Sequence, residues 1–489
     1  MALDNWFQNW HSPFLHEPLH APINHTTTPN ILPLLFTLNL VKPKEKKHFN
    51  NHFPIKLSKD EEFNSKSKTK NQTYEKENNL KPLEVTGPFK TWYRWKTLDF
   101  YYPTEEEKFE AIAKGDFVPE NNLPLGIEVY KDRIFLSMPK WKAGVPVTLA
   151  QLPRVPKKES PMLVPYPNWG WHSEKSCDLI TSVFRMQADS CGRLWVMDSG
   201  KVSITTEEAK QHCPPKLLIF DLETDQLLTK YVFANEFIKE DSLYSNIVVD
   251  VRDGYCHDAH AYMSDVWRFG IVVFRLSDQQ AWRVTDHLFY PDPLASSYRL
   301  HHLQFEWMDG VFGMALSPQK KPFDDRIMYF HPMSSFREFS LRTSYLRNEA
   351  ADNRDAFTIM GQSRGAQGHV SSSVMDKNGI MYFNLVTRDS IGCWDSGKPY
   401  KRENLGVVAR SKQTLVFPND MRLDQEEEQS MWVVTNRLPY YLIEGLDISR
   451  INFRVMSAYT EDSIKGTICD PNVHNEFTYV DYLEDIDCY

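Results

Sequence analysis

The hydrophobic residues of this chain recur in one pattern: a polar or glycine turn, a short apolar run with an aromatic residue, then a polar exit. The sharpest copy is residues 189–200, DSCGRLWVMDSG, in which Cys191 and Gly192 predict the turn and residues 194–197 the strand. The six copies are centred on Phe135, Trp195, Tyr262, Tyr329, Tyr382 and Trp432. Their spacing, roughly 50 to 67 residues, lies at or above the period of four-stranded propeller blades. The pattern therefore predicts an all-β fold, a six-bladed β-propeller.

Each blade is expected to be an up-and-down meander in which the strand closest to the axis precedes the aromatic strand. The second blade is the clearest, because residues 182–188, 193–197, 216–222 and 226–233 all read as strands. The sixth blade offers fewer convincing strands. We expect residues 95–101 to pair with it and close the ring, since closure removes an exposed sheet edge. Residues 103–113 predict a short helix with an acidic first turn.

The segments outside the repeats differ in composition. Residues 1–85 are interpreted as a disordered, flexible leader, because their second half is rich in Lys, Asn, Glu and Ser and cannot bury a core. Residues 86–470 form the propeller domain and 471–489 an acidic tail. Residues 31–41, ILPLLFTLNLV, are either a displaced secretion signal or an apolar patch in the leader. Asn24 and Asn71 begin N-glycosylation triplets.

Charge and cysteine content limit the function. The net charge of −9 and a pI near 6.0 give no support for nucleic-acid binding. No apolar run has the length of a membrane-spanning helix. The seven cysteines include no CxxC pair, so disulfides in an oxidising compartment are favoured over a zinc site or free thiols. The cysteines expected in disulfides are Cys177, Cys191, Cys213, Cys256, Cys393 and Cys469. Cys488 is the expected odd thiol, and Cys177 with Cys213 is a plausible pair within one blade.

Several motifs in one order resemble a known family. GRLWVMDSG, CPPKLLIFDL, GMALSP, IGCWD, NRL and INFR, between residues 91 and 469, are similar to the Yellow/major royal jelly protein family of insects. The resemblance implies a secreted, extracellular six-bladed propeller with a role in cuticle pigmentation and melanin chemistry. Some members are similar to dopachrome-converting enzymes, and others bind small aromatic amines or serve as nutritive proteins. The partner it implies is a small aromatic ligand: a catechol, an indole or an amine. The long leader departs from the family pattern.

The resemblance also implies ligand-binding positions. Around FPNDM and TNRL it matches Asn419, Met421, Asn436 and Leu438. The amide of Asn436 could donate and accept hydrogen bonds to an amine or catechol. The alternative is that this amide, like that of Asn384, satisfies backbone groups between blades.

Catalytic residues are not assigned by the sequence. Tautomerising a dopachrome needs a base that removes a carbon-bound proton and an acid that protonates the quinone oxygen, and histidine suits both roles. The available histidines are His260, His301, His302, His331 and His369, and no spacing selects among them. There is no nucleophile elbow, HExxH or phosphate loop in the repeats. Enzymatic activity, as a dopachrome tautomerase, therefore rests on the resemblance; a non-catalytic amine binder and a structural or nutritive protein remain alternatives.

No cofactor and no metal are expected. Asp250, Asp253, Asp258 and Asp265 lie near the third blade, where carboxylates could hold calcium. They fall mostly in hairpins, however, and Asp favours turns for local reasons. Asp198 could orient an amine, but capping the turn into Gly200 is the preferred interpretation.

Overall fold

The computed structural model describes residues 81–173, 175–239, 241–349 and 355–473. These belong to one compact unit that begins at Lys81. Nearly all of the predicted leader, with Asn24, Asn71 and residues 31–41, lies outside the described residues. Most of the acidic tail, with Cys488, lies outside them too.

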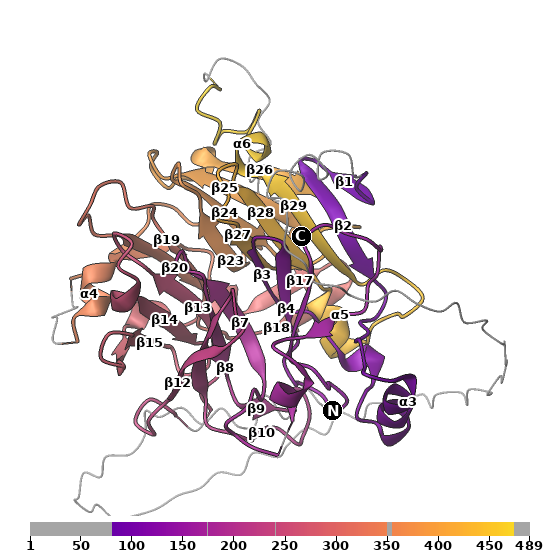
Figure 1. The fold of residues 1–489 in the computed structure, drawn as a ribbon. Coiled ribbons are helices and arrows are strands. Elements are labelled where there is room, and N and C mark those ends of the chain that lie inside the picture. The colour runs from indigo at the N-terminus through magenta and orange to yellow at the C-terminus, as the bar shows by residue number, and fades with distance from the viewer. Residues whose placement is uncertain (1–80, 174, 240, 350–354, 474–489) are drawn as a thin grey trace, which may run out of the picture. The chain divides into compact units, whose positions relative to one another are not determined.

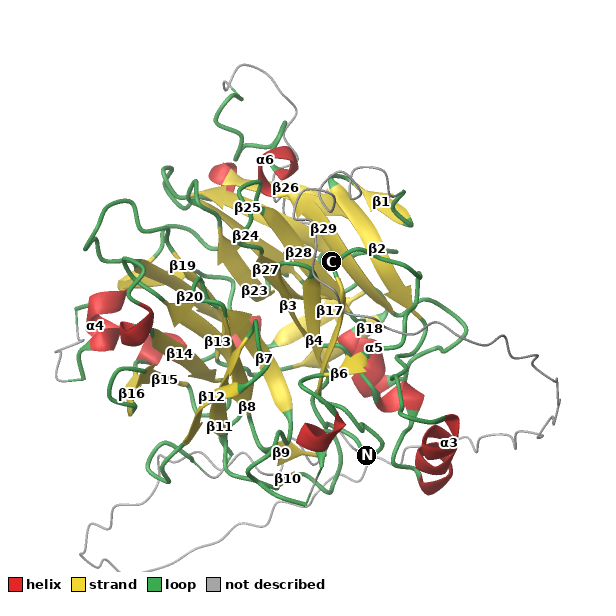
Figure 2. Cartoon of the chain, in the orientation of Figure 1, coloured by secondary structure: helices red, strands yellow, loops and turns green. Residues whose placement is uncertain are grey.

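Six antiparallel sheets form six blades (Figures 1 and 2). The first three are β3 (Gly126–Tyr130), β4 (Arg133–Ser137), β5 (Leu149–Pro153) and β6 (Val164–Pro165); β7 (Val183–Ala188), β8 (Arg193–Asp198), β11 (Lys216–Asp221) and β12 (Leu227–Val232); and β13 (Tyr244–Asp250), β14 (His260–Asp265), β15 (Gly270–Arg275) and β16 (Gln280–Thr285). The next two are β19 (Val311–Leu316), β20 (Ile327–Pro332), β21 (Phe339–Arg342) and β22 (Thr358–Ile359); and β23 (Val370–Met375), β24 (Ile380–Leu385), β25 (Ser390–Asp395) and β26 (Leu405–Arg410). The sixth is β27 (Pro418–Leu423), β28 (Ser430–Thr435), β29 (Phe453–Tyr459), β2 (Phe89–Trp95) and β1 (Glu84–Thr86).

The first strands of the blades surround the central axis. They contact one another in the order β3, β7, β13, β19, β23, β27 and back to β3, which closes the ring. All six aromatic anchors lie on the second strand of their blade and are buried. Because neighbouring blades cover both faces of these strands, both faces are apolar; every residue of β8 is buried. The predicted six-bladed propeller and its strand order are confirmed.

The ring is closed by the chain's first long strand, as expected, but the strand begins earlier. β2 pairs with β29 from Lys90 opposite Ser457 to Trp95 opposite Phe453. The prediction of residues 95–101 was wrong in its bounds, because the alternation that faces the sheet is FKTWYRW, buried at every second position. The predicted helix is present as α3 (Glu105–Lys114), with Thr104 accepting a hydrogen bond as its N-cap.

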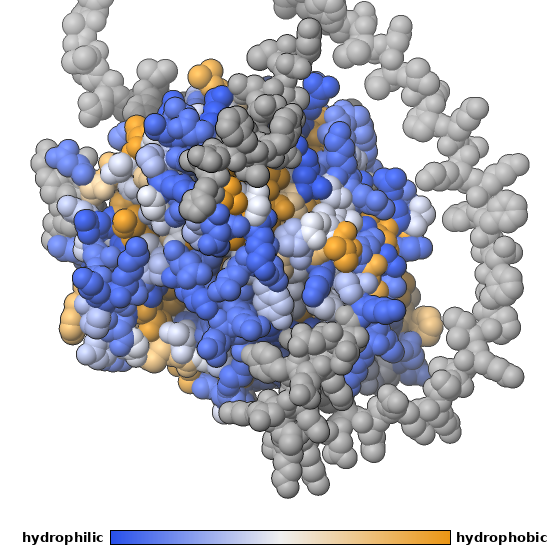
Figure 3. All heavy atoms as spheres, turned by 90° about the horizontal axis from the view of Figure 1, so that it is seen from above, coloured by the Kyte–Doolittle hydropathy of each residue, from blue (hydrophilic) through white to orange (hydrophobic). Residues whose placement is uncertain are grey.

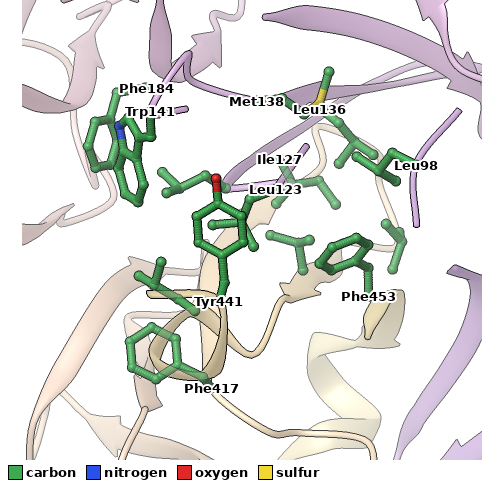
Figure 4. Packing of buried hydrophobic residues seen from close by; sticks show 14 of the residues in the cluster. Leu98, Leu123, Ile127, Leu136, Met138, Trp141, Phe184, Phe417, Tyr441 and Phe453 are labelled. Atoms are coloured by element: carbon green, nitrogen blue, oxygen red, sulfur yellow. The ribbon is translucent and has the colours of Figure 1, made fainter. Parts of the chain in front are cut away.

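Two insertions cover one end of the ring. The hairpin of β17 (Ser297–Leu300) and β18 (Leu303–Glu306) lies between the third and fourth blades, and α5 (Leu438–Ile443) lies between β28 and β29. Both join the largest apolar cluster, in which Trp307 of the hairpin segment packs 6.1 Å from Phe417, just before β27. Figure 4 shows Tyr441 of α5 projecting into this cluster beside Leu123. The hairpin and α5 therefore cover the end at which the first strands begin.

Three disulfides join the six cysteines expected to form them. Cys177–Cys213, the expected pair, is confirmed. Cys191–Cys256 ties the β7–β8 turn to the third blade, and Cys393–Cys469 ties β25 to the segment after β29. Three disulfides fit a protein that folds in an oxidising compartment.

The remaining strands and α-helices are short. They are β9 (Lys201–Val202), β10 (Lys210–Gln211), α4 (Thr343–Arg347) and α6 (Thr460–Ser463). Within the described ranges, no helix has the length and apolar character needed to cross a membrane. The face drawn in Figure 3 is mostly hydrophilic, and its apolar residues form small separate groups.

Candidate functional site

A pocket of about 670 Å³ opens beside the sixth blade, where the chain leaves β28 and enters α5. Its lining is strongly basic, with five Arg or Lys side chains against one carboxylate. The lining residues are Glu84, Arg94, His301, His302, Lys412, Gln413, Arg437, Tyr440, Arg450, Ile451 and Arg454. Arg437 and Tyr440 follow Asn436 directly in the sequence, so the pocket lies at the strand exit that the sequence singles out.

His301 is held between an acid and a phenol in this pocket. Its Nε2 lies 2.7 Å from Oδ2 of Asp389, and its Nδ1 lies 2.8 Å from the hydroxyl of Tyr440. Because the carboxylate of Asp389 accepts the Nε2 proton, a neutral His301 presents the lone pair of Nδ1 to Tyr440. Asp389 is buried, whereas 24% of the His301 side chain is exposed. The arrangement is an acid-oriented histidine that a ligand can reach, which is the geometry of general acid–base catalysis.

Three residues of the site have a left-handed backbone conformation. The φ angles of His301, Asp389 and Arg437 are 55°, 49° and 53°. His301 occupies the β17–β18 turn, Asp389 ends the β24–β25 turn and Arg437 precedes α5. Asp and His adopt this conformation more readily than most residues, whereas for Arg437 it costs about 1–2 kcal/mol. Other turns of the chain have the same conformation, so the geometry of the side chains and not the backbone singles out the site.

The electrostatics of the pocket are dominated by guanidinium groups. Glu84 binds both Arg94, at 3.1 Å, and Arg454, at 2.6 Å. Arg437 lies over the ring of Tyr440, 4.8 Å from its centroid. Burial raises the pKa of Tyr440, so its hydroxyl stays protonated at neutral pH and can donate to a ligand oxygen.

None of the four residues expected to bind ligand lines this pocket, and two of them, Asn436 and Leu438, are the sequence neighbours of the lining residue Arg437. Asn436 is buried; its Nδ2 donates to the carbonyl of Pro124 and its Oδ1 accepts from the amide of Leu438. Asn419 likewise donates to the carbonyl of Leu125, and the side chains of Met421 and Leu438 pack in apolar clusters. These contacts match the alternative interpretation, in which the Asn436 amide satisfies backbone groups between blades. The side chain joins the last blade to the first. Ligand contact by the four residues stays a prediction.

We expect Asn436→Ala to destabilise the ring. The substitution leaves the carbonyl of Pro124 and the amide of Leu438 unpaired in a buried site, at about 1–3 kcal/mol for each group. Urea unfolding followed by tryptophan fluorescence measures the loss. Unchanged stability together with weaker ligand binding would instead show that the amide serves the ligand, as the sequence-based hypothesis has it.

The structure separates the five candidate histidines. His302 makes an exposed pair with Glu444 at the pocket rim, and His331 is buried against Glu338. His260 and His369 are buried against backbone carbonyls, and burial lowers the pKa of both, to about 3 for His369. His301 is thus singled out by its surroundings. Its partners Asp389, Arg437 and Tyr440 were missed, because no local sequence pattern marks them.

The hydrogen bonding of two further sequence candidates, Asp198 and Asn384, differs. Asp198 accepts hydrogen bonds from the amides of Thr181, Ser182 and Gly200, which supports the turn-capping interpretation. Asn384 is buried, and neither of its amide atoms has a hydrogen-bond partner among the described residues, so the expectation that it satisfies backbone groups between blades is wrong.

The acids near the third blade do not form a calcium site in the described structure. Each carboxylate contacts donors of its own: Asp250 contacts Tyr262, Asp253 Phe323, Asp258 Arg252 and Asp265 Arg283. In the part of the chain that the structure describes, no group of three or more His, Cys, Asp or Glu residues could hold a metal ion.

Comparison with known proteins agrees with the fold. The family model described as major royal jelly protein matches residues 181–469. The chain is 43% identical over 400 residues to a dopaminechrome tautomerase of Drosophila melanogaster, across 80% of this chain and 86% of that protein. It is 36% identical over 384 residues to Protein yellow of Drosophila erecta, across 77% of this chain and 70% of that protein.

Among solved structures, the chain is similar to a luciferin-regenerating enzyme, with a TM-score of 0.40 and 10% identity over 70% of this chain and 94% of that one. That similarity is too distant to bear on function. The family match and the two relatives, together with the six-bladed ring, show that this chain belongs to the major royal jelly protein family, which includes the Yellow proteins.

Proposed function

We propose that this protein acts in pigment formation by tautomerising a small aromatic quinone of the dopaminechrome type. The observation that carries the proposal is the Asp389–His301–Tyr440 arrangement in the basic pocket. The relative that is 43% identical is named for this reaction, which supports the choice of substrate class. The reaction is an isomerisation, so it needs a base and an acid and no oxidant.

The residues have distinct roles in this proposal. Nδ1 of His301 removes a proton from a saturated ring carbon of the ligand, and Asp389 stabilises the imidazolium that forms. The C–H electron pair moves into the ring, and negative charge develops on the quinone oxygen. When the ligand binds, the hydroxyl of Tyr440 turns from Nδ1 of His301 to the quinone oxygen, and it stabilises that oxygen together with the guanidinium of Arg437. The oxygen then takes the proton from the imidazolium. Atoms and charge balance within one molecule.

The pocket favours this activity over the alternative of binding aromatic amines. Amines are cations at neutral pH, and the lining carries five Arg or Lys side chains against one carboxylate. A neutral quinone that becomes negatively charged in the transition state is the better match to such a lining. We further infer secretion, which the three disulfides support.

Mixing the purified full-length protein with dopaminechrome tests the activity. We expect its visible absorbance to fall faster than in buffer, and the excess rate to scale with protein concentration. Protein unfolded by heat is the control, because a pocket lined by segments that are distant in the sequence is lost on unfolding. No acceleration, together with saturable binding of an aromatic amine by calorimetry, would favour the non-catalytic binder.

A further inference from the structure

The positive charge of the pocket exceeds what its carboxylates balance. Glu84 is shared between Arg94 and Arg454, Arg94 also pairs with Glu159, and Arg450 lies 3.6 Å from Asp447. The two other cations that line the pocket are Arg437 and Lys412. In the described ranges, neither of these two side chains has a carboxylate within ion-pair distance.

Arg437 is held in an unfavourable electrostatic position. Its side chain is partly buried and stacks on Tyr440, and its φ is 53°. Burial lowers the pKa of Arg437, and the charge of Arg450 lowers it further. The charge of Asp389 opposes these effects, but Asp389 makes no ion pair with Arg437 in the described structure and instead binds His301. An anion beside Arg437 would offset both the desolvation cost of its charge and the repulsion from Arg450.

We propose that this pocket binds a divalent oxyanion, a sulfate or phosphate group, through Arg437 and Lys412, with Arg450 at the rim. The planar guanidinium donates paired hydrogen bonds that match oxyanion geometry, and the ammonium adds a point charge. A divalent group balances both uncompensated cations, whereas a carboxylate balances one. The binding depends on these cations and not on whether His301 is catalytic.

The size of the pocket indicates that the oxyanion is part of a larger ligand. Cavities of roughly 300–1,000 Å³ accommodate whole small molecules. At about 670 Å³ the pocket leaves room for an organic group attached to the anion. A small aryl phosphate, whose phosphate group carries close to two charges at neutral pH, therefore fits the site better than a free ion.

Calorimetric titration of the full-length protein tests this proposal. The probes are sodium sulfate, sodium phosphate and phenyl phosphate, with sodium acetate and phenyl sulfate, an ester of single charge, as the monovalent comparisons. Ionic strength is kept constant with sodium chloride, because screening alone weakens charge interactions. We expect saturable binding of the divalent anions and not of acetate or phenyl sulfate. Tighter binding of phenyl phosphate than of phosphate identifies an ester as the ligand, and equal binding identifies the free anion.

Three variants locate the site. Arg437→Asn removes the charge while asparagine tolerates the positive φ, and Lys412→Gln changes an exposed side chain that the fold does not need. We expect each to weaken anion binding at least tenfold. Lys465→Gln, an exposed lysine outside the pocket lining, makes the same charge change and should leave the affinity unaltered. No saturable binding by the wild-type protein, or an equal loss in all three variants, would overturn the proposal.

Discussion

Replacing His301 by glutamine is expected to lower the kcat/KM for dopaminechrome by about 10²–10⁴-fold, the range that general acid–base catalysis contributes. Glutamine keeps much of the size and the hydrogen-bonding capacity of the side chain, but it cannot accept and return a proton. The side chain is partly exposed and lies at a hairpin turn, so the unfolding midpoint should change little. Stopped-flow absorbance gives the rate, and circular dichroism checks the fold.

Two further variants decide what a loss of rate means. Asp389→Asn keeps the shape of the acid but can present an N–H to Nε2, which would favour the wrong tautomer of His301. It should therefore lower kcat more than it raises KM. His287→Gln, at an exposed histidine outside the pocket, is the matched control and should retain the wild-type rate. Equal activity of His301→Gln and His287→Gln would remove His301 from the mechanism.

The propeller could be predicted because its pattern is local and repeated. Each aromatic anchor lies on a strand that is covered on both faces, so the apolar run marks the second strand of every blade. The closing strand was misplaced because its partner β29 lies at the other end of the chain. Pairing over that distance decides which of two neighbouring aromatic runs enters the sheet, and no local pattern contains that information.

The pocket could not be predicted because its residues come together only when the ring closes. Asp389 lies 88 residues and Tyr440 139 residues from His301 in the sequence. The hairpin that carries His301 is an insertion between blades and has no counterpart in the repeat. The pocket lies at the strand exit after Trp432 that the sequence singled out, since Arg437 and Tyr440 line it, while Asn436 contacts the backbone of the first blade.

The second large effect is expected for the stability of the blade that contains the sharpest motif, residues 189–200. Asp198 and Lys216 form an ion pair at 2.8 Å, and both side chains are fully buried. The environments of the two charges differ. The carboxylate also accepts hydrogen bonds from three backbone amides, whereas the only other partner of the ammonium that we find in the described structure is the hydroxyl of Thr181. Removing the carboxylate therefore leaves an ammonium with one hydrogen-bond partner, whereas removing the ammonium leaves a carboxylate that keeps three.

Asp198→Asn is accordingly expected to cost about 3–5 kcal/mol of unfolding free energy, because it leaves the Lys216 ammonium buried without a counter-ion. The new amide would also point N–H donors at the ammonium, or at the backbone amides that donate hydrogen bonds to Asp198. Lys216→Met should cost no more than half as much, since three amides still satisfy the carboxylate and the methionine fills the space. Urea unfolding of both variants gives the two values. Equal costs, or the reverse order, would show that the pair and not the buried ammonium determines the stability of this blade.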